Sequence, residues 1–105
     1  MPPDMLIDTE QIAAFCRRHR VVRFALFGSV LREDFRPDSD IDILVAFADD
    51  ATPTLLDLAR MEEELAALFN RQVDLLTWQG VEHSHNALRR RAILDSAQVI
   101  YDAAA

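Results

Sequence analysis

The stretch Phe24-Ala25-Leu26-Phe27-Gly28-Ser29 is followed, after ten further residues, by Asp40-Ile41-Asp42-Ile43-Leu44-Val45. An apolar run that ends in two small residues thus precedes an apolar run that opens with two carboxylates. Side chains alternate along a strand, so Asp40 and Asp42 point to the same face, with Cα atoms roughly 6.6 Å apart. Such carboxylates can converge on two cations about 3.5–4 Å apart. Gly28 and Ser29 offer backbone N–H groups and a hydroxyl to a phosphate, which indicates metal-dependent chemistry on a nucleoside triphosphate.

The composition narrows the class of protein. At 105 residues, half of them hydrophobic, we expect a single domain over 1–105 with its core at about 8–101. The one cysteine, Cys16, excludes an internal disulfide. No apolar stretch approaches the roughly 18 residues of a membrane span. The first residues lack the basic and apolar regions of a signal peptide. We therefore expect a cytoplasmic protein without a membrane contact.

The charges exclude several chemistries. The net charge is −7 and all 11 basic residues are arginine. Without lysine there is no Schiff-base chemistry and no Walker-type phosphate loop. The acidic balance also argues against direct nucleic-acid binding. Two basic clusters, at 17–20 and 89–91, are best interpreted as helix surfaces that pair with local acids, with a partner or nucleotide contact as the alternative.

The hydrophobic periodicity predicts alternating helices and strands. Asp8 begins a helix with Ile12, Phe15, Cys16 and His19 on one face. Strands are expected at 21–27, 41–47, 73–77 and 99–101, a short helix at 29–34, a turn at 36–39 and a loop at 49–54. Longer helices are expected at 54–69, with glutamates 62–64 facing water, and at 84–97. This order predicts an α+β domain with a small mixed β-sheet flanked by helices.

Asp74 lies in the middle of the third predicted strand, where aspartate is rare. Asp40, Asp42 and Asp74 can be interpreted as residues of a solvated sheet face. However, Leu44 shares the face of Asp42, and carboxylates on an apolar surface need a partner or a metal. Together with Gly28 and Ser29, these three aspartates favour a metal-binding site over a solvated sheet face.

At this point the chain resembles the minimal nucleotidyltransferase domain of the DNA polymerase β-type superfamily. The resemblance rests on Phe27-Gly28-Ser29, Asp40-Ile41-Asp42 and Val73-Asp74-Leu75, and it covers residues 8–101. It implies transfer of a nucleoside monophosphate to a hydroxyl, with AMP from ATP as the expected group. It further implies that Asp40, Asp42 and Asp74 hold two Mg²⁺ ions and that Asp74 also accepts the hydroxyl proton. Gly28 and Ser29 would bind the triphosphate.

The sequence departs from the family pattern at two positions. Val30 and Glu33 stand where many members have an arginine and a glycine. Arg32 or Arg36 would then have to replace the missing arginine on the triphosphate, or nucleotide binding would be weaker.

Small stand-alone chains of this superfamily resemble antitoxins of two-component toxin–antitoxin pairs. That resemblance implies a HEPN-type ribonuclease toxin as partner, whose tyrosine hydroxyl receives AMP. Two alternatives stay open. A catalytically weak antitoxin could neutralise its partner by stoichiometric binding, or the enzyme could modify a small-molecule hydroxyl.

Other candidate residues are weaker. A metal site at His83 and His85 would lack a third ligand nearby, so exposed loop positions are the better interpretation. Trp78 could stack on a base, but packing at the edge of the core is favoured. Cys16 is expected to lie in the core, and His19 is expected to be packed or to act as a helix cap.

Overall fold

The computed structural model describes residues 8–28 and 40–104, and its elements follow the predicted alternation closely. In chain order they are α1 (Thr9–His19), β1 (Val21–Phe27), β2 (Ile41–Phe47), α2 (Leu55–Phe69), β3 (Val73–Thr77), α3 (Trp78–Glu82), α4 (Ala87–Ser96) and β4 (Gln98–Asp102). The helix expected at 29–34 and the turn expected at 36–39 lie outside the described residues.

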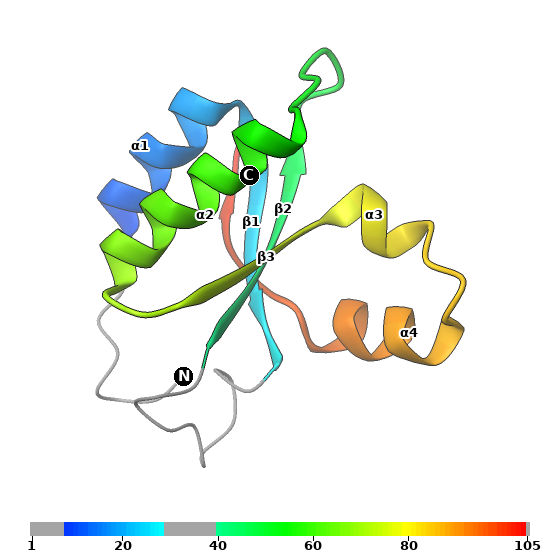
Figure 1. The fold of residues 1–105 in the computed structure, drawn as a ribbon. Helices are drawn as coiled ribbons and strands as arrows, with labels where there is room; N and C mark the ends of the chain where they lie inside the picture. The colour runs from blue at the N-terminus through cyan, green and yellow to red at the C-terminus, as the bar shows by residue number, and fades with distance from the viewer. Residues whose placement is uncertain (1–7, 29–39, 105) are drawn as a thin grey trace.

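The four strands form one mixed sheet in the order β3-β2-β1-β4 (Figure 1). β1 pairs antiparallel with both β2 and β4, whereas β2 and β3 run parallel. The parallel pair aligns Ile41 with Val73 and Asp42 with Asp74. Both outer strands, β3 and β4, are edges of the sheet. The predicted α+β class with a small mixed sheet is confirmed.

Helices cover both faces of the sheet, and the strand alternation divides the apolar side chains between them (Figure 1). Side chains of α1 and α2 meet one face and bury the residues Ile12, Phe15, Phe24, Ile43 and Leu65, among others. α3 and α4 lie against the opposite face, where the buried residues are Ala25, Phe27, Leu44, Val81 and Ile93. Neighbouring residues of β2 therefore belong to two separate apolar layers.

The helix ends are set by local side chains. Asp8 accepts hydrogen bonds from the backbone N–H groups of Glu10 and Gln11, as an N-cap does. Thr54 and Asp57 form a reciprocal capping box at the start of α2. Asn70 ends that helix in the left-handed conformation at φ 55°. Among the described helices, none is long and apolar enough to cross a membrane.

Two helix predictions need correction. The sequence predicted no helix at Trp78–Glu82, yet α3 begins there, with Thr77 accepting the N–H of Gly80. The helix predicted from residue 84 begins at Ala87 instead, because the Asn86 side chain accepts the N–H of Arg89 and acts as its cap. Both starts are decided by short side-chain caps that hydrophobic periodicity does not reveal.

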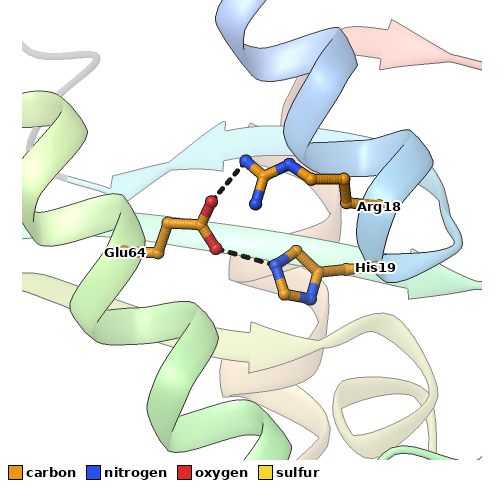
Figure 2. A network of polar contacts seen from close by, with 3 residues as sticks. All are labelled: Arg18, His19 and Glu64. Atoms are coloured by element: carbon orange, nitrogen blue, oxygen red, sulfur yellow. Dashed lines mark hydrogen bonds and ion pairs between the residues drawn. The ribbon is translucent and has the colours of Figure 1, made fainter.

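Glu64 links α2 to α1, which corrects the prediction that glutamates 62–64 all face water. Its carboxylate pairs with the Arg18 guanidinium and lies 2.7 Å from Nε2 of His19 (Figure 2). The His19 ring also packs on Phe15, with ring centroids 4.6 Å apart. Burial alone would raise the pKa of Glu64, but hydrogen bonds from Arg18 and His19 outweigh it and lower the pKa below its ordinary value.

Cys16 lies in the layer between the sheet and the two long helices and has no exposed surface. Burial raises the pKa of its thiol to about 12, against a smaller lowering by Arg17. The thiol is therefore protonated at neutral pH and serves packing, as the sequence predicted.

The lowered pKa of Glu64 predicts a pH-dependent contribution to stability. The contribution is present above the ordinary glutamate pKa of 4.5 and is lost as the pH falls through the lower pKa of the folded protein. We expect Glu64→Gln to reduce the free energy of unfolding at pH 7, and the difference from the wild type to shrink below about pH 4.5. Urea titrations between pH 3 and 8 measure this. Glu63→Gln, an exposed neighbour, is the control, and an equal pH profile in both variants would contradict the assignment.

A second prediction concerns Phe24, which is fully buried and meets Phe15 edge-on with centroids 6.2 Å apart. Phe24→Ala should lower the free energy of unfolding by about 3–5 kcal/mol, because it leaves a cavity in a closed layer. Leu88→Ala, at a residue that is 83% exposed, should change it by less than about 0.5 kcal/mol. Equal effects of the two substitutions in chemical denaturation would refute this account of the core.

Candidate active site

The Asp42 carboxylate lies directly against the end of β1. Asp42 is paired with Phe27 across the antiparallel ladder, and Gly28 follows at φ +75°, in the left-handed region. A Cβ atom at position 28 would come within 2.3 Å of Asp42 Oδ2. Only glycine therefore satisfies both the backbone conformation and the close approach of the carboxylate. The two halves of the sequence motif are in contact in the folded chain.

The register of β2 and β3 brings the predicted carboxylates to neighbouring positions. Asp42 and Asp74 are partners in the parallel ladder, on strands about 4.8 Å apart. Asp40 directly precedes β2, and both Asp40 and Asp74 are exposed. These two line one surface hollow, whose other residues include Glu62 and Glu63 of α2. Asp40, Asp42 and Asp74 thus lie towards the same end of the β2–β3 pair, although Asp42 does not line this hollow.

The predicted carboxylates are suited to divalent cations that take some of their ligands from the protein and the others from a bound substrate. Within residues 8–28 and 40–104, no three histidine, cysteine or acidic side chains are grouped closely enough to hold a metal ion by themselves. Mg²⁺ is typically bound by one or two carboxylates, and phosphate oxygens and water complete its six positions. Asp40 and Asp42, with Asp74 on the neighbouring strand, would supply the carboxylates of such a site.

Ser29, Val30 and Glu33 lie outside the described residues, as do Arg32 and Arg36. Their expected roles at the triphosphate therefore rest on the sequence. The described part of the predicted site comprises Gly28, Asp40, Asp42 and Asp74.

The prediction that the Glu62 side chain faces water is wrong. Glu62 is half-buried, and its Oε2 accepts the backbone N–H of Leu75, at 3.2 Å, on the outer edge of β3. The relevant signal is its spacing within α2. Glu62 follows the buried Met61 and precedes the buried Leu65 by three residues, so it lies at the border of the apolar face.

The remaining candidates have structural contacts. Arg20 binds both carboxylate oxygens of Asp50, at 2.5 and 2.6 Å, and Arg18 binds Glu64. Arg18 and Arg20 of the first basic cluster therefore pair with acids, as predicted, but these acids come from other elements and are not local in sequence. Trp78 packs at the edge of the second apolar layer, with the Arg23 guanidinium 5.0 Å from its ring centroid. His83 and His85 are exposed, as predicted.

Comparison with known proteins shows the family of the chain. Residues 9–100 match the model of the family described as "Nucleotidyltransferase domain". The chain is 42% identical over 79 residues to the protein adenylyltransferase MntA of Thermococcus cleftensis, covering 68% of this chain and 78% of the relative.

Solved structures share the fold. A structure described provisionally as a minimal nucleotidyltransferase superimposes with a TM-score of 0.65 and 38% identity, covering 86% of each chain. A structure of the tri-AMPylated HEPN toxin of Shewanella oneidensis in complex with MNT antitoxin gives a TM-score of 0.60 at 21% identity. This likeness covers 90% of this chain and 69% of the other, and it shows the fold alone. The chain belongs to the nucleotidyltransferase domain family and is an enzyme of that class.

Proposed function

We propose that this protein transfers AMP from ATP to a tyrosine hydroxyl of a HEPN-type ribonuclease toxin and thereby acts as its antitoxin. The observation that carries the proposal is the placement of Asp42, which touches Gly28 and is in register with Asp74. A nucleotide on Gly28 would have its α-phosphate beside the carboxylates of two adjacent strands.

At the α-phosphorus, the reaction forms one P–O bond and breaks another. The acceptor oxygen attacks the α-phosphorus of ATP, and a new P–O bond forms as the bond from this phosphorus to the β-phosphate oxygen breaks. Pyrophosphate leaves, and the hydroxyl proton passes to the Asp74 carboxylate. Asp74 is suited to this role because it is exposed at the edge strand, where an acceptor can approach.

Asp40, Asp42 and Asp74 are the residues that would hold two Mg²⁺ ions. When bound, Mg²⁺ neutralises phosphate charge that these carboxylates alone would repel. Gly28 lets the triphosphate approach the backbone, and Ser29 would donate its hydroxyl to it. This chain has no lysine, so arginine is its only permanently charged cationic side chain for the phosphates.

The acceptor is proposed from the relatives. The Thermococcus cleftensis relative is named a protein adenylyltransferase. The structural neighbour from Shewanella oneidensis is an MNT antitoxin in complex with an AMPylated HEPN toxin. Carried over to this chain, these names indicate a protein acceptor of the HEPN type and a cytoplasmic reaction that consumes ATP.

Two other functions make different predictions. A binding antitoxin would protect its partner without catalysis, and the departures at Val30 and Glu33 favour this alternative. A small-molecule nucleotidyltransferase would label its acceptor in the absence of any protein partner. Both can be separated from the proposal by variants of the site.

Gly28→Ala should impair both stability and transfer. An alanine in the left-handed conformation costs about 1–2 kcal/mol, and its Cβ would displace the Asp42 carboxylate. We expect a decrease in the midpoint of thermal unfolding and a transfer rate at least about 100-fold lower. The double variant Gly28→Ala/Asp42→Ala removes the clash, so it should regain part of the stability but no activity. A Gly28→Ala enzyme as active as the wild type would disprove the contact.

Asp42→Asn should abolish transfer, because it removes the negative charge with which the Asp42 carboxylate would bind the metal beside the phosphate. Intact-mass spectrometry of a HEPN-type partner incubated with the chain, Mg²⁺ and each nucleoside triphosphate should show a gain of one or more AMP groups with ATP only. The gain should be absent with the variant, whereas binding to the partner persists. If the unmodified partner is nevertheless protected by both proteins, the binding antitoxin is the correct function.

A further inference from the structure

A groove of about 340 Å³ runs along the outer edge of β3, between α2 on one side and α3 and α4 on the other. Figure 1 shows β3 between these two groups of helices. The groove is mainly apolar, and among the described residues one cationic side chain lines it. Its apolar side chains and that cation are Leu58, Leu75, Leu76, Val81, Ile93 and Arg89.

The groove begins one residue beyond Asp74 along β3, since Leu75 and Leu76 line it and Asp74 does not. Asp74 and Leu76 are two residues apart on β3, so their side chains point to the same face of the strand at a spacing of about 7 Å. The ladder confirms this, because Asp42 pairs with Asp74 and the buried Leu44 pairs with Leu76. A molecule whose apolar side chain rests on Leu76 would therefore reach Asp74 with an adjacent hydroxyl.

The edge of β3 limits how an occupant can bind. The outward N–H of Leu75 already donates to Glu62, so an added strand could not pair with the sheet at this position. The occupant must therefore insert side chains and cannot extend the ladder there.

The apolar surface also widens beyond the groove. Leu55 lies one turn before Leu58 on the same face of α2 and is 86% exposed.

The charge of the groove selects for an acidic occupant. Arg89 is exposed, and no ion pair to it occurs among the described residues. Arg91 adds a second exposed cation on α4, whereas Arg90 donates to the backbone carbonyl of Ser84 at 2.7 Å. This local positive charge stands out in a chain with a net charge of −7.

We infer that the groove is the docking site for the acceptor segment of the partner protein. That segment carries an apolar side chain for Leu58, Leu75 and Leu76, an acidic side chain for Arg89, and, next to the apolar side chain, the hydroxyl that reaches Asp74. The inference rests on the proposed function and deepens it, because it names the features that select one hydroxyl of a protein over others.

The test compares two charge reversals on the same helix. Arg89→Glu lies in the groove, and Arg91→Glu is a matched control outside its lining. With a purified HEPN-type protein as acceptor, Arg89→Glu should raise the KM for the acceptor about tenfold, which corresponds to about 1.4 kcal/mol. Arg91→Glu should change it by less than about twofold. A reversal of one acidic residue of the acceptor to arginine should restore the activity of Arg89→Glu only.

The outcomes separate this inference from the proposed function. Equal changes with both variants, or no change with either, would overturn the groove while leaving the transferase intact. If the wild type transfers no AMP, the proposed function fails, and the dissociation constant of the partner complex then tests the groove alone. Weaker binding of Arg89→Glu than of Arg91→Glu supports the groove, and equal binding or no complex overturns it. Titration of each variant with ATP alone verifies that it is folded.

Discussion

The parallel register between β2 and β3 is the constraint on which both the core and the site depend. It places Asp42 beside Asp74 and, one residue along, Ile43 beside Leu75. Since side chains alternate, the register that joins the carboxylates on one face also joins apolar side chains beneath α2 on the other. A shift of β3 by one residue would turn Asp74 towards α2 and move Leu75 to the opposite face. The packing energy of the apolar layer thus fixes the geometry of the site.

Gly28 connects this register to β1. Its left-handed φ lets the chain leave β1 without a side chain at the point where Asp42 lies. The absence of a side chain at Gly28 thus makes room for the Asp42 carboxylate against the backbone. The repulsion between neighbouring carboxylates is tolerated because they lie at the end of the strand pair, where Asp40 and Asp74 are exposed to water and to cations.

Much of this could be predicted from the sequence because the strongest patterns coincide with the central elements. The strands at 21–27, 41–47 and 73–77 match β1, β2 and β3 residue for residue, since each is bounded by polar or turn residues. α3 was missed because five residues with a glycine show no helical period. The contacts of Glu62 and Glu64 were missed because their partners, the Leu75 N–H and the side chains of α1, come from other elements. No local pattern specifies such partners, which depend on how helices pack on the sheet.

The proposed catalytic carboxylate and the proposed docking groove share one strand, β3. One end of this five-residue strand carries the carboxylate at which the hydroxyl would react, and the other end lines the apolar groove. Because both belong to one strand, the strand repeat fixes the distance between the apolar side chain in the groove and the hydroxyl at Asp74. This distance does not depend on the conformation of a loop. The enzyme would therefore select its acceptor by the spacing of an apolar side chain and a hydroxyl on the partner's surface. A correctly spaced pair of groups on the partner would supply both the binding energy and the orientation of the attacking oxygen.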